Sequence, residues 1–181
     1  MRIGIFGGAF DPPHVAHLMA VSYALATQQL DKVLVIPCWI HSFGKQLTPF
    51  PMRFDMAQLA FKQFDPRYVE VSNVEQELRV SYTYDLILGL KRLHPEDEFT
   101  LIMGADEWDV RKKWYRWDDI EEMVKVATVG RENVSSKAVN LPDISSSAIR
   151  GLLKESWGRA ACEPLVPSEV LDYIDQNGIY R

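Results

Sequence analysis

The sequence predicts an α/β fold with a doubly wound parallel sheet of about five strands and helices on both faces. Short, continuous apolar runs alternate with segments of helical spacing from the first residues onward. Such runs are typical of strands buried on both faces, and their alternation with helices is typical of βαβ units. Residues 38–49 and 131–143 lack these patterns, and the first of the two segments is expected to form a loop of the ligand site. The expected strands cover residues 2–6, 32–36, 69–71, 99–103 and 124–129.

The helices are expected between these runs. Apolar residues at helical spacing predict one helix that begins near Pro13, a second that opens at Pro51 and a third that is capped by Ser81. A short last helix is expected to pack back on the domain through Val170 and Ile174. These elements together predict a Rossmann-like sheet, in which ligands bind at the carboxyl ends of the strands.

Length and composition indicate one domain over residues 1–181, in which residues 144–181 form a C-terminal helical part. A chain of 181 residues with 47% hydrophobic content can bury one core. No run approaches the roughly 20 apolar residues of a membrane span, and a strand pattern rather than a signal peptide follows Met1. Two cysteines are too few for a disulfide framework, so a cytoplasmic protein is expected. The net charge of -5 argues against a nucleic-acid polymer as a partner.

The segment after the first strand carries most of the chemistry. Gly7 and Gly8 let the backbone approach a ligand closely, and the helix start behind them offers free N–H groups and a positive dipole end. The glycine pair alone would be better interpreted as a bare turn. His14 and His17 share one face of that helix start, where two imidazoles can donate hydrogen bonds to phosphate oxygens. Zinc would require a third ligand that is not evident here, so no protein-held metal is expected.

Two further segments have the chemistry of a nucleotide site. Ser145 and Ser146 suit a helix N-cap that leaves N–H groups for an anion, and Arg150 adds a planar charged fork about one turn later. After the fourth strand, Gly104 permits a close approach, and the carboxylate of Asp106 can accept hydrogen bonds from ribose hydroxyls. Taken alone, the serines and Arg150 would be better interpreted as a capped surface helix, and Asp106 would equally suit a helix cap.

The segment from Gly7 to His17 resembles the Gly-x-Phe-Asp-Pro-x-His-x-x-His signature of the nucleotidyltransferase superfamily. Residues 144–150, Ile-Ser-Ser-Ser-Ala-Ile-Arg, resemble its second signature, Ile-Ser-Ser-Thr-x-x-Arg, with Ser147 in place of threonine. Within this superfamily the chain is most similar to the bacterial nicotinate-nucleotide adenylyltransferases. Further similarity covers nearly the whole chain, through residues 81–85, 102–106, 113–117 and 166–180.

The resemblance implies adenylyl transfer from ATP to nicotinate mononucleotide, which yields deamido-NAD and pyrophosphate in NAD biosynthesis. It implies that His17 stabilises the transition state at the α-phosphate and that His14 positions the phosphates. Lys45 and Arg150 are expected to neutralise the triphosphate, together with Mg²⁺ that is held mainly by phosphate oxygens. The residues implied to bind ATP are Gly7, Gly8, Phe10, Gly104, Asp106, Ser145 and Ser146. The C-terminal part, residues 144–181, is thus expected to complete the ATP site. The set implied for the mononucleotide is Thr83, Tyr84 and Trp114, with Trp114 favoured over Trp117 for stacking on the pyridine.

Departures from the family pattern concentrate on the substrate side. Residues 40–45 read Ile-His-Ser-Phe-Gly-Lys where the family usually shows Pro-His-Lys, Ala9 replaces Thr or Ser, and no Gly-Pro precedes Ser81. Nicotinamide mononucleotide and phosphopantetheine therefore stay open as acceptors. A non-catalytic nucleotide-binding regulator and a nicotinamide-dependent oxidoreductase also stay open, although the latter lacks its glycine fingerprint. Acid-versus-amide preference, loop motion and a homo-oligomeric state are not predicted by the sequence.

Overall fold

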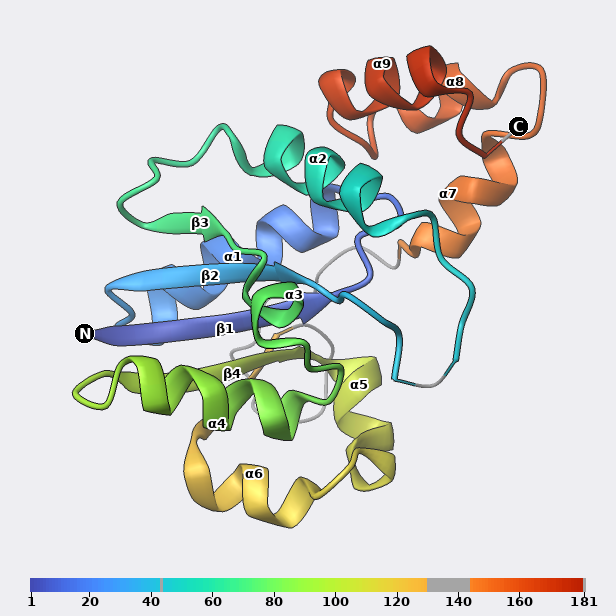
Figure 1. The fold of residues 1–181 in the computed structure, drawn as a ribbon. Helices are drawn as coiled ribbons and strands as arrows, with labels where there is room; N and C mark the ends of the chain where they lie inside the picture. The colour runs from blue at the N-terminus through green and yellow to red at the C-terminus, as the bar shows by residue number, and fades with distance from the viewer. Residues whose placement is uncertain (43, 130–143, 181) are drawn as a thin grey trace.

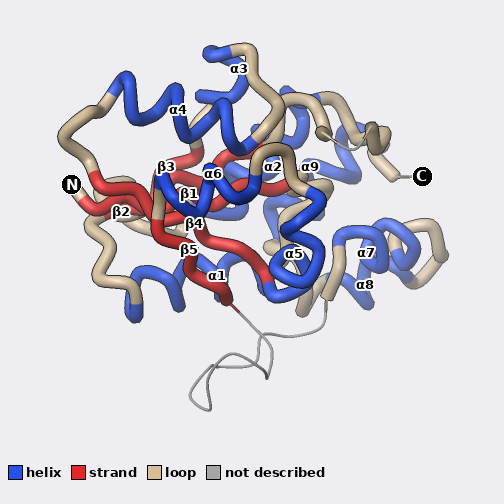
Figure 2. Tube along the Cα trace, turned by 90° about the horizontal axis from the view of Figure 1, so that it is seen from below, coloured by secondary structure: helices blue, strands red, loops and turns tan. Residues whose placement is uncertain are grey.

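Five parallel strands form the centre of the protein in the computed structural model, which describes residues 1–42, 44–129 and 144–180. Their spatial order is β3-β2-β1-β4-β5, and each neighbouring pair runs parallel. The predicted fold class is confirmed, and Figure 2 shows the strands with helices on both sides. The strands are β1 (Arg2–Gly8), β2 (Lys32–Pro37), β3 (Val69–Val71), β4 (Glu98–Gly104) and β5 (Lys125–Val129).

Helices cover the sheet in two groups, each with its own apolar core. The first core joins the sheet to α1, α2 and the C-terminal helices, and the second joins it to α3, α4 and α6. In the described part of the chain, none of the helices has both the length and the apolarity that a membrane crossing requires. The helices are α1 (Val15–Thr27), α2 (Phe50–Phe61), α3 (Val74–Leu78), α4 (Thr83–Leu93), α5 (Ala105–Val110), the 3-10 helix η1 (Arg111–Lys113), α6 (Trp117–Met123), α7 (Ser146–Leu152), α8 (Gly158–Cys162) and α9 (Ser168–Asn177).

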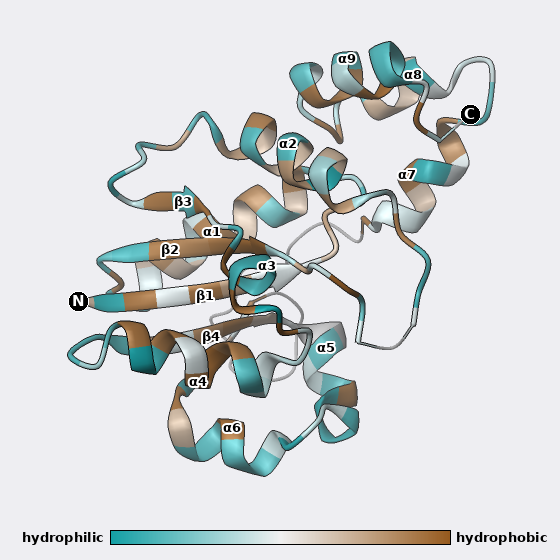
Figure 3. Ribbon diagram, in the orientation of Figure 1, coloured by the Kyte–Doolittle hydropathy of each residue, from teal (hydrophilic) through white to brown (hydrophobic). Residues whose placement is uncertain are grey.

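The alternation of side chains along β1 explains how one strand contributes to both apolar cores. Ile3 and Ile5 belong to the second core, whereas Phe6 belongs to the first, because successive side chains in a strand point to opposite faces. Both faces of this strand are therefore apolar, and the central strands are strongly hydrophobic in Figure 3. Burial on both faces is the reason that the sequence shows continuous apolar runs here instead of an apolar–polar alternation.

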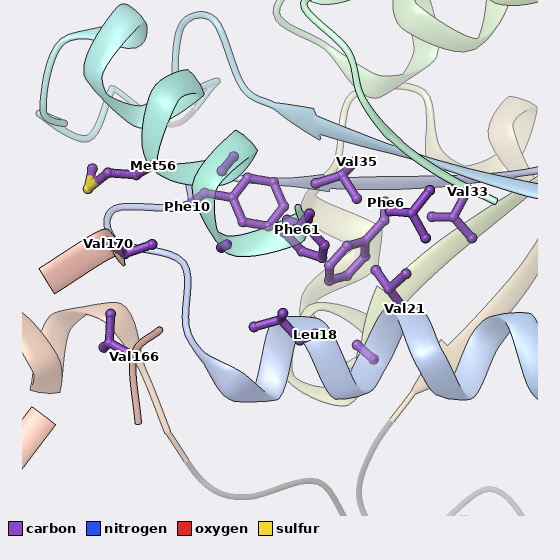
Figure 4. Close-up of a cluster of buried hydrophobic side chains, with 14 of the residues drawn as sticks. Phe6, Phe10, Leu18, Val21, Val33, Val35, Met56, Phe61, Val166 and Val170 are labelled. Carbon is purple, nitrogen blue, oxygen red and sulfur yellow. The ribbon is translucent and has the colours of Figure 1, made fainter. Parts of the chain in front are cut away.

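The C-terminal helices pack on the first core. Val170 and Ile174 of α9 are 0% and 2% exposed, as expected for a helix that packs back on the domain. In Figure 4, Val166 and Val170 lie in the same cluster as Phe10 and Met56. The helices α7, α8 and α9 lie at the end of the sheet away from the N-terminus, where the parallel strands finish (Figure 1).

Several boundaries and short helices differ from expectation. The N-cap of α4 is Tyr82 rather than Ser81, and β5 begins after Val124, which is the C-cap of α6. The short helices α3 and α6 were not predicted. Arg79 ends α3 and Arg116 precedes α6, both with positive φ angles of 55° and 56°. Glycine or asparagine usually occupies such left-handed positions at helix boundaries. Because arginine stands at both positions here, the sequence did not indicate either boundary.

The chain path creates a topological switch point between β1 and β4. From β1 the chain builds outward through β2 to β3 and then returns to place β4 on the other side of β1. The connections on the two sides of β1 therefore diverge, and a crevice forms outside the carboxyl ends of these two strands. Gly7 and Gly8 end β1, and Gly104 ends β4, so the glycines that the sequence singled out lie at this switch point.

Candidate active site

A cavity of about 340 Å³, here called the switch-point cavity, opens where β1 and β4 end. Gly7 and Gly104 line it, and a Cβ atom built on either residue would meet nothing within 4 Å. The backbone is thus exposed to a ligand at both strand ends, which is the use of glycine that the sequence indicated. The remaining wall comes from the loop after β2, from α3 and α4, and from the segment that includes Trp114.

Gly8 and Phe10 have a structural relation that the sequence did not reveal. A Cβ atom on Gly8 would lie 3.1 Å from the Phe10 ring, so a larger residue here would push against that ring. Phe10 has a φ of 48° and is 1% exposed, and its ring meets His17 edge-on at a centroid distance of 5.0 Å. Its side chain is an anchor in the first core beneath the histidines, which leaves only its backbone for the expected contact with ATP.

His14 and His17 lie at the start of α1 with their rings close together and tilted by 31°. Their ring centroids are 3.8 Å apart, and the backbone N–H of His14 donates to Nδ1 of His17 at 3.1 Å. A neutral imidazole has one donor and one acceptor nitrogen, so Nδ1 of His17 is the acceptor and Nε2 carries the proton. Burial lowers the pKa of His14 from 6.5 to about 4, and burial followed by the neighbouring His14 lowers the pKa of His17 well below its ordinary value. Both rings are therefore neutral at pH 7.

The two sequence motifs meet directly, although more than 130 positions separate them. Ser146 Oγ donates to the Pro12 carbonyl at 2.8 Å, and Arg150 Nη1 donates to the Asp11 carbonyl at 2.6 Å. Ser145 is the N-cap of α7 and accepts a hydrogen bond from Ala148, as the sequence predicted. Ser146 is thus engaged in joining the motifs. The assembled group, here called the motif cluster, comprises Asp11, His14, His17, Ser146, Arg150 and Tyr180.

Sequence reasoning missed Asp11 and Tyr180 as members of this cluster. Asp11 is only 3% exposed, and its carboxylate accepts hydrogen bonds from the Tyr180 hydroxyl at 2.5 Å and from the Thr48 N–H at 3.2 Å. Arg150 Nη1 lies 4.0 Å from the same carboxylate. The Asp-Pro pair in the first motif was visible, but no local pattern links it to a tyrosine 169 positions later.

Arg53 was also missed, and it fixes the loop between β2 and α2. Its side chain is buried, and its guanidinium donates to the carbonyls of Ala9, Cys38 and Thr48 at 2.7 to 2.8 Å. The ends of this loop are thereby tied to the first motif. Its middle is more open, since Lys45 is exposed and does not line the switch-point cavity. The expected contact of Lys45 with a triphosphate stays a prediction.

Glu75 introduces a buried carboxyl into the cavity wall. It is 5% exposed, and Oε2 accepts the backbone N–H of Trp39 at 2.9 Å. Burial raises the pKa of Glu75 to about 7, although the Trp39 hydrogen bond and the charge of Arg53 act in the opposite direction. The carboxyl therefore changes its charge near neutral pH, in the wall of the switch-point cavity. The signal in the sequence was a single Glu in a mixed segment, which says nothing about burial.

The aromatic residues divide between cavity and core. Trp114 lines the switch-point cavity and a smaller adjoining cavity of about 290 Å³, whereas Trp117 is 3% exposed in the second core. The two indoles meet edge-on at 5.9 Å. Thr83 lines both cavities at the first turn of α4. The Tyr84 side chain instead packs with Arg116, whose guanidinium lies 4.1 Å from the ring centroid, so Tyr84 can offer the cavity its backbone rather than its ring.

Some expected residues lie outside the description. The backbone of Asp106 is part of α5, but its side chain is not among those described, and residues 43, 130–143 and 181 are likewise outside it. Within the described ranges, no group of three His, Cys, Asp or Glu side chains is arranged to hold a metal ion.

Comparison with known proteins assigns the family. The family model described as cytidylyltransferase-like matches residues 5–152. A curated relative from Anaeromyxobacter sp. (strain K), named "Probable nicotinate-nucleotide adenylyltransferase", is 41% identical over 99% of this chain and 97% of its own. One of the same name from Myxococcus xanthus is 34% identical over 99% and 95%. The chain belongs to the nicotinate-nucleotide adenylyltransferase family.

The fold of this adenylyltransferase chain agrees with that of solved structures. A Plasmodium falciparum nicotinic acid mononucleotide adenylyltransferase complexed with NaAD matches with a TM-score of 0.82 at 22% identity, over 99% of this chain and 97% of its own. A putative nicotinate-nucleotide adenylyltransferase from Vibrio parahaemolyticus matches with a TM-score of 0.75 at 23% identity, over 99% and 95%. At these identities the likeness concerns the fold, while the curated relatives confirm the family that the two motifs predicted.

Proposed function

We propose that this protein transfers the adenylyl group of ATP to the 5′-phosphate of nicotinate mononucleotide, which yields deamido-NAD and pyrophosphate. One observation carries the proposal. Arg150 and Ser146 of the second motif donate hydrogen bonds to the carbonyls of Asp11 and Pro12 in the first, which precede His14 by three and two positions. A permanent cation and two neutral imidazoles are thereby gathered at the N-terminus of α1, which is an arrangement suited to a chain of phosphates.

The chemistry needs positioning more than activation. The second pKa of a phosphate monoester is about 6, so the attacking oxygen is already largely ionised at pH 7. It attacks the α-phosphorus in line, and pyrophosphate leaves. His17 donates Nε2–H to the charge that develops at the α-phosphate, because its Nδ1 is held as an acceptor by the His14 N–H. His14 positions the phosphates, and Arg150 and Lys45 offset the charge of the triphosphate.

The mononucleotide occupies the switch-point cavity in this proposal. Its pyridine stacks on Trp114, which lines the cavity beside Thr83. The first backbone N–H groups of α4, at Thr83 and Tyr84, have no partners within their own helix and are suited to the nicotinate carboxylate. We expect Gly7, Gly8 and Gly104, at the strand ends, and Asp106, near the start of α5, to contact the ribose and phosphate groups of the nucleotides.

ATP binds as its magnesium complex. Mg²⁺ commonly keeps several waters and binds through substrate phosphates, so the ion is expected to be carried mainly by phosphate oxygens. Mg²⁺ would neutralise charge on the triphosphate. We assign residues 144–181 to the same domain as the part that completes the ATP site, since Ile149, Val166 and Val170 share the first core with β1. We place the reaction in the cytoplasm, where ATP is available and where free cysteines such as Cys38 and Cys162 stay reduced.

The test is release of pyrophosphate from Mg-ATP with nicotinate mononucleotide, nicotinamide mononucleotide or phosphopantetheine as the acceptor. Turnover with nicotinate mononucleotide at tenfold or more over the amide is expected (order of magnitude, about 1.4 kcal/mol). The His17→Ala variant, prepared in parallel, separates the activity of this chain from that of a contaminant. Faster turnover with another acceptor would leave adenylyl transfer in place but show that the acceptor assigned to the cavity and its altered loop is wrong. Absence of pyrophosphate with all three would refute adenylyl transfer.

A further inference from the structure

The Asp11 carboxylate is a buried negative charge close to a cation that the reaction requires. Among the described residues, the carboxylate accepts hydrogen bonds from the Tyr180 hydroxyl at 2.5 Å and the Thr48 N–H at 3.2 Å, and both donors are uncharged. Arg150 Nη1 lies 4.0 Å from the carboxylate and donates instead to the Asp11 carbonyl at 2.6 Å. The neutral donors therefore satisfy the carboxylate without a close ion pair.

Tyr180 is well placed to remain such a donor. Burial, together with the hydrogen bond to Asp11, raises the pKa of its phenol, so the hydroxyl keeps its proton at any pH at which the protein works. The residue follows α9 and has a φ of 68°, a left-handed conformation that is unusual for tyrosine. The hydrogen bond from its hydroxyl to Asp11 joins the end of the C-terminal part to the first motif.

Loss of the hydroxyl would leave the carboxylate with one direct donor. A buried carboxylate that loses a donor carries a large desolvation penalty and recruits the nearest available cation. Here that cation is Arg150, whose side chain is 24% exposed and within 4.0 Å. A closed Asp11–Arg150 pair would withdraw the guanidinium from the phosphates of ATP.

We propose that Tyr180 is a positioning residue for ATP: its hydroxyl holds the Asp11 carboxylate in neutral hydrogen bonds and so keeps the Arg150 guanidinium available to the triphosphate. The proposal rests on the proposed adenylyl transfer, and it places the end of the C-terminal part in control of the ATP half of the site. It acts through Arg150 and not through contact with the substrate. The mononucleotide half, formed by the switch-point cavity, is unaffected.

The experiment compares Tyr180→Phe with Tyr173→Phe. Tyr173 donates to Asp55 Oδ2 at 2.8 Å, so the control also removes one phenol–carboxylate hydrogen bond from the C-terminal part, but at α2. For Tyr180→Phe we expect KM for Mg-ATP and Kd for α,β-methylene-ATP to rise about tenfold, the scale of a hydrogen bond to a charged group. KM for nicotinate mononucleotide stays within about twofold, and Tyr173→Phe leaves both KM values within about twofold (an order-of-magnitude margin).

A double variant tests the route through Asp11. In an Asp11→Asn background there is no carboxylate to capture Arg150, so Tyr180→Phe is expected to change ATP-analogue affinity by less than about twofold. An equal effect of Tyr180→Phe with and without the carboxylate would overturn the proposal, as would a uniform rise in both KM values. Failure of the wild-type protein to release pyrophosphate would instead count against adenylyl transfer, since the analogue binding ratio does not depend on turnover.

Discussion

The motif cluster and the switch-point cavity are built by different means. In the motif cluster, side chains from the two ends of the chain are cross-linked by hydrogen bonds, as Arg150 and Tyr180 are to Asp11. In the cavity, strand-end glycines, Trp114 and one buried carboxyl surround open space. In the proposed function, the cluster holds the charges that face the phosphates, and the cavity decides which acceptor fits. On that proposal the chemistry and the choice of acceptor are separable, which is consistent with intact family motifs beside an altered His41–Lys45 loop.

The largest effect is expected in the motif cluster. His17→Ala removes a preorganised donor to the α-phosphate, and kcat is expected to fall by about 10²–10³. KM for the mononucleotide changes little, because the cavity wall does not include this ring. His94→Ala, at the exposed C-cap of α4, is the matched control and should leave kcat within about twofold (an order-of-magnitude margin). A fall in kcat of less than tenfold for His17→Ala would contradict the role of His17 as a donor to the α-phosphate.

The cluster should also weaken the fold as acid is added. The pKa of His14 is lowered from 6.5 to about 4, so between these pH values the unfolded chain binds a proton that the folded protein excludes. Stability therefore falls as pH drops through that window, by about 3 kcal/mol for this group. Urea unfolding at pH 7 and pH 4.5 is the measurement. The His14→Gln variant should lose less stability than the wild type over the same interval; an identical loss would contradict the assignment.

The sequence predicted the features that depend on local patterns and missed those that depend on tertiary contacts. The strands, the glycine ends and the motif histidines were predictable because each follows from local patterns of burial, backbone freedom and helix capping. The roles of Asp11, Arg53 and Tyr180 depend on partners that only folding brings together. Trp114 could be favoured over Trp117 only through the family resemblance, because an indole three residues away has the same local chemistry.

The contribution of Glu75, in the cavity wall, to folding stability should change with pH in the opposite direction from that of His14 in the cluster. The raised pKa of Glu75, from 4.5 to about 7, means that the folded protein retains a proton that the unfolded chain has released. Stability falls as pH rises through that window, by about 2 kcal/mol after allowance for water in the cavity. Glu75→Gln keeps an acceptor for the Trp39 N–H and should gain this amount over the wild type between pH 4.5 and pH 8. Glu77→Gln makes the same change on the exposed side of α3 and should show no such gain.

The smallest effect is expected for the aromatic wall of the cavity, and it tests the separation most directly. Trp114→Ala removes the surface on which the pyridine stacks, so KM for nicotinate mononucleotide should rise about tenfold, or about 1.4 kcal/mol. KM for Mg-ATP should not change. Trp157→Ala, at an indole that is 58% exposed, controls for the loss of a tryptophan elsewhere. An equal rise in both KM values, with normal thermal unfolding, would show that the cavity and the cluster form one coupled site. In that case acceptor choice could not have varied independently of the phosphate chemistry.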